Sequence, residues 1–538
     1  MLRNIFKKQI NSITLAAGLV AVSSLASRFL GVIRDRILAG EFGAGANLDM
    51  YYAAFRIPDL VFNLVVLGAL SAGFIPVFTV LLEKNDENKK AAWDLANNIF
   101  NFLFLGISGL SLIGIIFAPY LMRLVAPGFS PSEQETVVSL TRIMFLSPLF
   151  LGISGILGGV LQSFKRFLIY SLAPILYNLG IIFGALYLVD FWGLYGLAWG
   201  VIIGAILHAA IQIPAVYQLG FRYRWRLDRH DEATRRIGKM MIPRTLSLAT
   251  GQINLVVVTA IASGLASGSI AIFNFANNLQ SFPVGVFGIS FAVAAFPTFS
   301  AQANDNNRLQ DSFSRTIRQI FFFIIPATVF IIALRAQIIR IVLGTGNFNW
   351  EDTILTMNTL GFFALSLFAQ AATPLLTRVF YAKQDSATPF YLGLGTVGVN
   401  VILSLFLAPR LGVSGLALAF SAANILYFML LWIWLSARIG SLHIGKILIS
   451  VIKFTASAIM AGASIQVMKL AIWPFIDMSK FSGVFIQLVS SSLVGLLVYL
   501  FMCHILRSEE FENFWSSFKQ RWPFNKVRID DQGEARGI

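Results

Sequence analysis

Charged side chains lie inside the first two long apolar segments of this chain, where a membrane-spanning helix should carry none. The first segment has Arg28, Arg34, Asp35 and Arg36 in or beside it, and the second has Asp49, Arg56 and Asp59. An arginine or aspartate near the centre of a bilayer costs about 2.5–3.5 kcal/mol on insertion scales. Such charges persist where they face water or one another, so the pattern predicts a polar, cationic chamber enclosed by membrane helices.

The composition of the chain is that of a polytopic membrane protein. Of its 538 residues 57% are hydrophobic and only 12% are charged, whereas soluble domains are about 25% charged. The net charge of +15 would also suit a nucleic-acid-binding protein. Because cytoplasmic loops of membrane proteins collect lysine and arginine, the apolar composition favours the membrane and excludes a nucleic-acid partner.

No pattern in the chain indicates catalysis or a resident metal. Cys503 is the only cysteine, and the four histidines are scattered without metal-ligand spacing. The sequence has no Walker motif, no glycine-rich phosphate loop and no Ser/His/Asp or paired-carboxylate arrangement that stands out as catalytic. We therefore expect a transporter rather than an enzyme, without catalytic residues, a metal site or a cofactor.

Hydropathy predicts an all-α fold with about fourteen membrane spans, each needing roughly 20 apolar residues. The expected spans are 10–38, 48–82, 93–124, 136–163, 168–190, 193–220, 238–264, 270–302, 316–344, 352–383, 388–408, 412–437, 446–470 and 482–507. Most arginines and lysines outside the spans fall in loops on one side, above all in 221–237. The positive-inside rule then places both termini in the cytoplasm.

Two weak sequence matches at nearly the same offset indicate an internal duplication. Gly193-Leu-Tyr-Gly-Leu-Ala recurs in the second half as Gly412-Val-Ser-Gly-Leu-Ala, and Pro76 recurs in similar surroundings as Pro297, at almost the same separation. Each copy would hold six spans, so both copies share one orientation and a pseudo-twofold along the membrane normal relates them. The expected divisions are an N-lobe (1–220), a basic cytoplasmic linker (221–237), a C-lobe (238–440), two extra spans (441–507) and a cytoplasmic tail (508–538).

The arginines of the first two spans are the main candidates for an anion-binding site. Arg28 and Asp35 are seven residues apart and differ by about 20° around a helix, so they share a stripe that Arg34 flanks. The alternatives are a structural ion pair or an arginine that reaches the membrane interface. Arg56 could instead form an interhelical polar lock with Asp35 or Asp49, and such a lock could open when cargo arrives.

Further candidates lie in the second half of the chain. A polar stripe of Asn274, Asn277, Asn278 and Ser281 follows helical spacing and would either line the chamber or join helices by hydrogen bonds. Arg244 and Arg378 would either capture cargo or anchor lipid headgroups. Because the guanidinium group grips phosphate through two parallel hydrogen bonds, a lipid-linked pyrophosphate would suit several converging arginines.

Several motifs resemble the MurJ (MviN) lipid II flippase family of the multidrug/oligosaccharidyl-lipid/polysaccharide exporter superfamily. They are Ser27-Arg28-Phe-Leu-Gly31-Val-Ile-Arg34-Asp35, Phe42-Gly43-Ala44-Gly45, Ala54-Phe55-Arg56-Ile-Pro58, Phe282-Pro283-Val-Gly285-Val-Phe-Gly288 and Phe380-Tyr381-Ala-Lys383-Gln384-Asp385-Ser-Ala-Thr388-Pro389. The resemblance implies a two-lobed flippase whose central cavity opens alternately to each side of the bacterial inner membrane. It would move the undecaprenyl-pyrophosphate-linked peptidoglycan precursor, lipid II, to the outer leaflet for cell-wall synthesis.

The resemblance also implies roles for particular residues and partners. The cationic cavity would include Arg28, Arg34, Asp35, Asp49 and Arg56, and the two extra spans would form a groove for the lipid tail. Membrane lipids would be partners, and cell-wall synthesis proteins are candidates.

This chain departs from the family pattern at three places. Phe62 and Asn63 stand where relatives carry an arginine, and Asn277-Asn278 stands where relatives carry Asp-Arg. Some relatives have a sodium site, for which Asn254, Asn400 and Ser404 are the candidates here, but no carboxylate matches and no cation is assigned.

The departures leave other functions to weigh against the flippase. The main alternative is an exporter of another polyprenyl-linked oligosaccharide. A cation-coupled drug exporter would prefer an anionic cavity, which the arginines oppose, and a non-transporting membrane scaffold would tolerate loss of the cavity charges.

Overall fold

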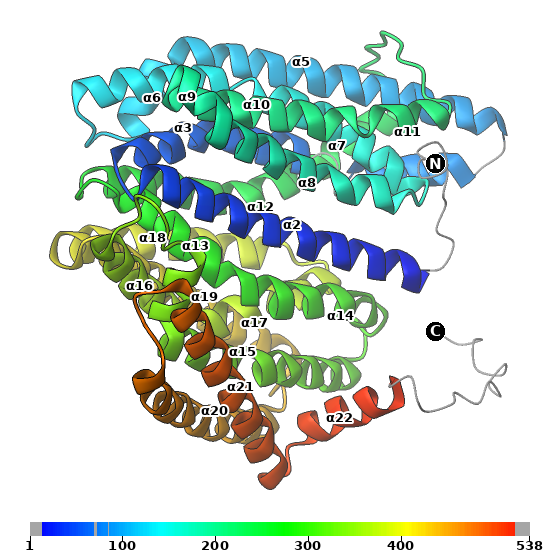
Figure 1. The fold of residues 1–538 in the computed structure, drawn as a ribbon. Coiled ribbons are helices and arrows are strands. Elements are labelled where there is room, and N and C mark those ends of the chain that lie inside the picture. Colours follow the sequence, from blue (N-terminus) through cyan, green and yellow to red (C-terminus); the bar gives the residue numbers. More distant parts are fainter. Residues whose placement is uncertain (1–12, 69–72, 84–85, 522–538) are drawn as a thin grey trace. The chain divides into compact units, whose positions relative to one another are not determined.

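The computed structural model describes residues 13–68, 73–83 and 86–521, and nearly all of them are helical (Figure 1). The α-helices are α2 (Ile13–Phe42), α3 (Ala46–Phe62), α4 (Ile75–Glu83), α5 (Asp86–Val125), α6 (Pro131–Met144), α7 (Ser147–Ser163), α8 (Phe167–Phe183), α9 (Val189–Trp192), α10 (Leu194–Ala210), α11 (Ile213–Gln218), α12 (Glu232–Ser263), α13 (Ser269–Pro283), α14 (Ser290–Ala301), α15 (Asn306–Val342), α16 (Trp350–Ala364), α17 (Leu367–Ala382), α18 (Ala387–Leu411), α19 (Val413–Ile439), α20 (Ile444–Ile472), α21 (Phe481–Ile505) and α22 (Glu509–Arg521). Short π-helices η1 (Asn63–Leu67), η3 (Gly184–Leu188) and η4 (Val284–Ile289) and the 3₁₀ turn η5 (Trp473–Phe475) complete the list. The predicted all-α fold is confirmed for this part of the chain.

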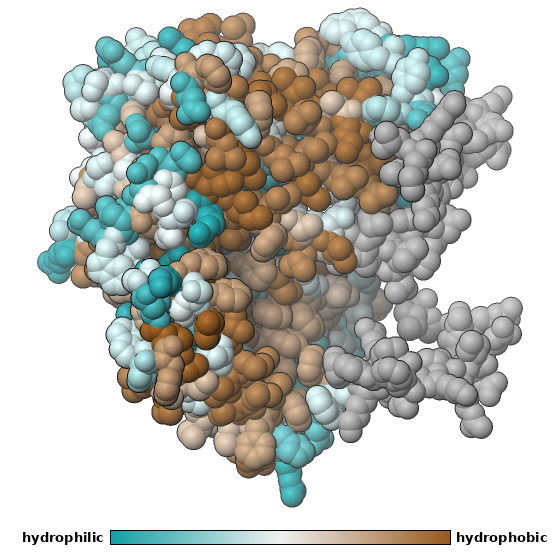
Figure 2. Space-filling view, viewed as in Figure 1, coloured by the Kyte–Doolittle hydropathy of each residue, from teal (hydrophilic) through white to brown (hydrophobic). Residues whose placement is uncertain are grey.

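Ten helices or joined helices of the described residues are long and apolar enough to cross a membrane. An eleventh span is present if α16 and α17, which meet at a 46° bend, count as one. The predicted number of fourteen is not confirmed by this criterion. The remaining expected spans, 10–38, 48–82 and 238–264, are helical where they are described. They carry the charged residues between Arg28 and Asp59 and also Arg244, and they are not among the ten apolar spans. Hydrophobic side chains cover much of the face shown in Figure 2, as a membrane-embedded surface requires.

The backbone repeats unusual conformations at the spacing expected from the duplication. Gly193 and Gly412 both have positive φ, 56° and 60°, with ψ of −140° and −143°, and each begins a long helix. Lys165 and Gln384 are separated by the same offset as these two glycines, and they share the same unusual φ of 57° and 59°. Because a non-glycine residue rarely adopts positive φ, the coincidence supports the repeat more strongly than either sequence match.

Both repeats also contain a π-helical segment in the corresponding span. Helices η1 and η4 begin at Asn63 and Val284, at the same offset as Pro76 and Pro297, and η4 directly follows Pro283. Proline removes a hydrogen-bond donor and its ring displaces the carbonyl four residues earlier, and a π-segment is one way to accommodate an irregular ladder. The two proline-bearing spans therefore both contain widened turns.

The chain folds into two compact units. Unit 1 is Met1–Phe282, Arg335–Ala369 and Gln384–Leu431, and unit 2 is Pro283–Leu334, Gln370–Lys383 and Trp432–Ile538. The division into lobes over 1–220 and 238–440, with a pseudo-twofold between them, stays a prediction.

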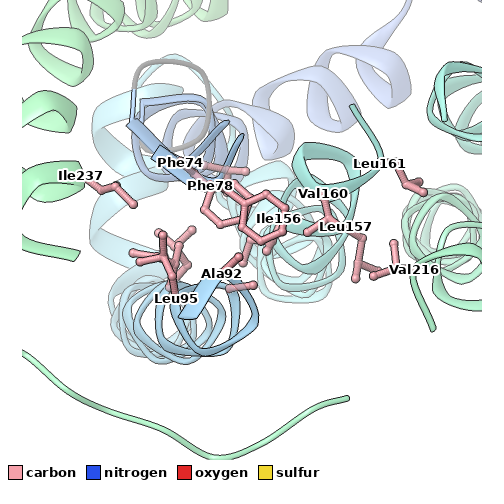
Figure 3. Packing of buried hydrophobic residues seen from close by; sticks show 14 of the residues in the cluster. Phe74, Phe78, Ala92, Leu95, Ile156, Leu157, Val160, Leu161, Val216 and Ile237 are labelled. Carbon is pink, nitrogen blue, oxygen red and sulfur yellow. The ribbon is translucent and has the colours of Figure 1, made fainter. Parts of the chain in front are cut away.

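A core of unit 1 joins α4, α5 and α7 (Figure 3). Phe74 and Phe78 are fully buried and stack on each other with ring centroids 5.1 Å apart. Trp93 of α5 stacks on Phe164 at the end of α7, with centroids 5.6 Å apart and ring planes 11° apart. Phe78 of α4 contacts both Trp93 and Phe164, with ring centroids 5.7 and 6.3 Å away. Aromatic pairs contribute about 0.5–1.5 kcal/mol beyond their buried area, so these contacts hold the three helices together.

Helix α8 and the π-helix η3 that continues it approach α10 of unit 1 closely through glycines. A Cβ added at Gly184 would lie 2.5 Å from the Cα of Gly200, and one added at Gly200 would lie 2.6 Å from the Cα of Gly184. Gly180 faces Gly204 in the same way one turn along. Since lipid tails are as apolar as leucine, membrane helices associate through such close van der Waals contact rather than through the hydrophobic effect.

The basic segment 221–228 is extended and lies along α5. Asn97, Asn98 and Asn101 of α5 hydrogen-bond its backbone at Arg222, Arg224, Arg226 and Asp228, over distances of 2.7–3.1 Å. Three buried asparagines therefore replace the hydrogen bonds that a helix or sheet would supply. Helix α12 begins at Glu232, inside the predicted linker 221–237, because the Asp231 side chain accepts from the backbone N–H of Thr234 at 2.8 Å.

In unit 2 the last helices pack on α15. The Tyr499 hydroxyl of α21 donates to the carbonyl of Phe322 at 2.7 Å, and Arg318 forms ion pairs with Glu509 and Glu510 of α22 at 2.9 and 2.7 Å. The Arg318 guanidinium holds the pKa of the Glu509 carboxyl below its ordinary value. The tail 508–538 contains the short helix α22, and its residues beyond 521 lie outside the described residues.

Candidate functional site

Arg34 and Asp35 of α2 form an ion pair at the centre of one polar network. Arg34 donates to Asp35 Oδ1 from Nη2 at 2.8 Å and from Nε at 3.1 Å, and its Nη1 donates to Asn178 Oδ1 of α8 at 3.2 Å. The other carboxylate oxygen, Oδ2, accepts from Asn278 Nδ2 of α13 at 2.9 Å. The side chains of Arg34 and Asp35 are 23% and 8% exposed, so the pair is largely withdrawn from water while the arginine keeps some access.

Arg56 of α3 lies in a second network that contains only neutral partners. Its Nε donates to Thr259 Oγ1 of α12 at 2.7 Å, and its Nη2 donates to Asn274 Oδ1 of α13 at 2.8 Å. The predicted lock between Arg56 and either Asp35 or Asp49 is wrong for this structure, since each aspartate has other partners. Asp59, three residues further along the same chain segment, is the carboxylate whose charge acts on Arg56, but it is not among the ion pairs within 4.0 Å of the described residues.

One face of α13 connects the two arginine networks. Asn274 binds Arg56, and Asn278, one turn further along, binds Asp35. Residues four apart on a helix are neighbours about 5–6 Å apart at their Cβ atoms. The stripe predicted at 274–281 therefore joins α2, α3 and α13 through side-chain hydrogen bonds. Its neighbour Asn277 instead accepts from Gln280 Nε2 at 3.0 Å.

Asp49 has a structural role in this conformation. Only 3% of the residue is exposed, and its two carboxylate oxygens accept from the backbone N–H groups of Gly268 and Ala271, at 2.7 and 2.8 Å. These N–H groups lie at the start of α13, where the first turn has no internal partners. Gly268 has a φ of +90°, and a Cβ there would collide with the carbonyl oxygen of Ala44. Asp49 thus fastens the start of α3 to the start of α13.

Arg28 does not join the networks of Arg34 and Arg56. Its side chain is exposed on α2, and the described residues provide it with no hydrogen-bond or ion-pair partner. It precedes Asp35 by seven residues, about 10 Å along the helix axis. The shared stripe therefore does not bring Arg28 to Asp35, because Arg34 is adjacent to that carboxylate and occupies it.

Two further arginines, Arg244 and Arg378, were predicted as site residues in later helices. Arg378 of α17 belongs to unit 2, where its guanidinium carbon lies 5.3 Å from the ring centroid of Phe296. Arg244 lies in α12, but its side chain is outside the described residues. Their predicted capture of cargo stays a prediction.

Three residues of the two networks were not singled out as site residues from the sequence. Asn178 and Thr259 are single polar residues within apolar stretches, and Asn274 was recognised only as part of the stripe. A polar side chain in an apolar span is the one signal that could have indicated Asn178.

A separate polar cluster joins α12 and α18. Asn400 Nδ2 donates to Asn254 Oδ1 at 2.6 Å, while Asn400 Oδ1 and Ser404 Oγ are buried without a hydrogen-bond partner in the described part of the chain. The three sodium candidates therefore do gather. They are neutral, and no group of three or more His, Cys, Asp or Glu residues that could hold a metal is present among the described residues.

Comparison with known proteins supplies a family for this arrangement. The family model described as lipid II flippase MurJ matches residues 38–485. A relative from Buchnera aphidicola, described as a probable lipid II flippase MurJ, is 28% identical over 496 residues, which are 90% of this chain and 96% of the relative.

Solved structures agree with the fold. One described as lipid II flippase MurJ in an inward closed conformation superposes with a TM-score of 0.74 at 24% identity, over 93% of this chain and 99% of the other. An inward-facing multidrug resistance MATE family transporter of the MOP superfamily superposes with a TM-score of 0.65 at 14% identity, over 77% of this chain and 95% of the other. These two likenesses concern the fold alone.

Proposed function

This chain belongs to the lipid II flippase MurJ family, and from that membership we propose that it carries lipid II across the bilayer with Arg34 and Arg56 as the groups that bind the pyrophosphate. The single observation that carries the residue assignment is the polar face of α13, which connects both arginines. An exporter of another polyprenyl-linked oligosaccharide is not favoured by the family match.

Arg56 is the stronger of the two anion-binding groups in this proposal. Its partners Thr259 and Asn274 are neutral acceptors, so they orient the guanidinium without cancelling its charge. Charge-assisted hydrogen bonds to phosphate are roughly twice as strong as those between neutral groups, and the planar fork can make two of them. A pyrophosphate would therefore form stronger hydrogen bonds with Arg56 than the amide and hydroxyl oxygens that it displaces.

Arg34 would bind cargo in competition with Asp35. The carboxylate already satisfies two guanidinium nitrogens, so the cargo must either displace it or share Arg34 with it. Such competition weakens binding, and a transporter needs weak enough binding to release its cargo on the far side. Asn178 and Asn278 would keep the arginine and the carboxylate in place while the cargo comes and goes.

The same networks suggest how cargo would couple to movement. Arg56 bridges α3 to α12 and α13, and Asp35 bridges α2 to α13. Cargo that takes over these arginines would break the bridges and lower the cost of separating the helices. We propose that this exchange drives alternating access, without a cofactor or a chemical step.

Further features of the family expectation remain part of the proposal. Helices α20 and α21 would hold the lipid tail, and the arginine-rich segment 221–237 would face the cytoplasm of a bacterial inner membrane. Both termini would then be cytoplasmic by the positive-inside rule. Cell-wall synthesis proteins would be the partners that supply and consume lipid II.

Complementation of a flippase-depleted bacterium tests the proposed function. Arg56→Gln and Arg34→Gln should abolish growth while membrane insertion persists, and lipid II should not become accessible at the outer leaflet. Arg410→Gln is the matched control, because Arg410 is exposed at the end of α18. Normal growth with both Arg56→Gln and Arg34→Gln would contradict the residue assignment. Failure of the unaltered protein to complement would contradict the proposed function.

A further inference from the structure

A polar pocket outside the arginine networks lies where α5 ends and α6 begins. It has a volume of about 740 Å³, and its charged lining residues are Arg123, Glu135 and Arg142. Arg123 and Arg142 are exposed, and the described residues provide Arg123 with no hydrogen-bond partner. Arg142 donates only from Nε, to the carbonyl of Ile115 at 3.2 Å. Two arginines and one glutamate leave the pocket with one net positive charge.

An apolar groove adjoins this pocket. It has a volume of about 440 Å³ and lies between the end of α5 and the helices α12 and α18. Its lining is aliphatic and includes Leu124, Val256, Val257, Ala260, Val401 and Leu405. Pro127 lines both spaces. Of two consecutive residues of α5, Arg123 lines the pocket and Leu124 lines the groove. The pocket and the groove therefore adjoin at Pro127, with charged residues on one side and aliphatic residues on the other.

The loop that separates the two spaces is held by specific bonds. The backbone N–H of Gly128 donates to Ser263 Oγ at the end of α12 at 3.1 Å, and Gln134 Nε2 donates to the carbonyl of Ala126. A Cβ at Gly128 would collide with the carbonyl of Ser263, so the loop lies directly against α12. Pro127 is consequently fixed between both spaces, and the site is built into the fold of unit 1.

We propose that this pocket and groove bind one anionic phospholipid of the surrounding bilayer. The phosphodiester would lie between Arg123 and Arg142, Gln134 and Ser139 would hydrogen-bond a glycerol headgroup, and one acyl chain would follow α12 and α18. A single net positive charge complements the single negative charge of a phosphodiester better than the higher charge of a pyrophosphate. The bound lipid would seal α5 against α12, the helix that holds the Thr259 partner of Arg56.

Native mass spectrometry of the full-length protein tests this site, with phosphatidylglycerol and phosphatidylcholine supplied in equal amounts. The unaltered protein should retain phosphatidylglycerol selectively. The double variant Arg123→Gln, Arg142→Gln should bind the lipid about a hundredfold more weakly, because it removes two charge-assisted bonds to phosphate and each contributes roughly a factor of ten. Arg410→Gln removes one arginine charge at an exposed site that lines neither space, and it should retain the lipid normally.

A second variant tests the groove independently of the arginines. Ala260→Phe should fill the groove and lower retention of the long-chain lipid, while soluble glycerophosphate should still compete at the headgroup pocket. Unchanged phosphatidylglycerol retention in the double arginine variant would overturn the proposal. Retention of inorganic phosphate without lipid, or a preference for polyprenyl pyrophosphate, would also overturn it. Arg56→Gln should leave the retention of phosphatidylglycerol unchanged. A failure of the proposed lipid II transport can therefore be distinguished from a failure of this lipid site.

Discussion

Arg34 and Arg56 differ in the charge of their partners, although both are arginines in the first two helices. Arg34 is paired with Asp35 at 2.8 Å, whereas Arg56 is held by a hydroxyl and an amide oxygen. A partly buried charge is costly in a membrane helix, and it marks a candidate functional site. In the proposed function, this difference would let Arg56 capture the anion and let Arg34 exchange Asp35 for it.

Asp35→Asn should bind lipid II more tightly and transport it more slowly. The substitution removes the carboxylate that competes for Arg34 and keeps an amide of the same shape, so the cargo loses its competitor. Binding of lipid II to the purified protein should tighten by about tenfold, the effect of one charge-assisted hydrogen bond. Flipping in reconstituted vesicles should fall. Weaker binding by this variant would contradict the competition and favour a purely structural ion pair.

Asp49→Ala should lower stability without changing the affinity for lipid II. The substitution leaves the buried N–H groups of Gly268 and Ala271 without acceptors, at a cost of about 1–3 kcal/mol for each group. Thermal unfolding in detergent should show a lower midpoint for Asp49→Ala than for Asp49→Asn, which keeps one acceptor oxygen. Equal midpoints for Asp49→Ala and the unaltered protein would show that the helix start has other partners.

At the scale of helices, small residues decide which elements can touch. Gly184 and Gly200 let α8 and α10 approach until their backbones meet. Helix α8 also carries Asn178, the partner of Arg34 on α2. The glycine contact therefore sets the position of one wall of the arginine network.

Gly200→Leu should separate α8 from α10 and destabilise unit 1. A leucine Cβ would lie 2.6 Å from the Cα of Gly184, which is backbone and cannot rotate away. Overpacking of this kind costs about 1–3 kcal/mol, so the thermal midpoint in detergent should fall. Gly109→Leu in α5 is the control, since a Cβ there meets nothing within 4 Å. Similar thermal midpoints for Gly200→Leu and Gly109→Leu would show that the close contact between the helices does not contribute to stability.

For the whole molecule, the proposed function makes the membrane potential a source of energy. An anion that moves outward through a potential that is negative inside gains about 2.3 kcal/mol per charge for each 100 mV. In the proposed function, Arg34 and Arg56 would hold the anionic cargo, and the potential would favour its outward movement.

Collapse of the membrane potential should therefore slow transport of lipid II. In reconstituted vesicles with a potassium gradient, adding valinomycin to set the potential from zero to negative inside should raise the outward rate. A sodium gradient imposed at zero potential serves as the control and should have little effect. Transport that is unchanged at zero potential would exclude this energy source, and dependence on sodium would direct attention to Asn254, Asn400 and Ser404.

The sequence by itself determined the class of the fold and the type of residue at the candidate site. Hydropathy and composition decide for membrane helices because about 20 consecutive apolar residues have no other stable surroundings. The duplication is visible in the sequence as two weak matches, and the backbone supports it at Gly193 and Gly412, since a turn that requires positive φ restricts the residues that can occupy it. The charges at 28–59 were correctly identified as unusual, because their cost in lipid depends on residue type alone.

Only the tertiary structure decided which partner each charged residue has. Arg34 contacts Asn178 of α8, and Asp49 binds the backbone of Gly268 and Ala271 at the start of α13, all of them far away along the chain. Spacing along one helix predicted a shared stripe for Arg28 and Asp35, but Arg28 lies apart. A hydrogen bond requires atoms within about 3 Å, and that distance depends on how each helix is rotated and packed against helices distant in sequence.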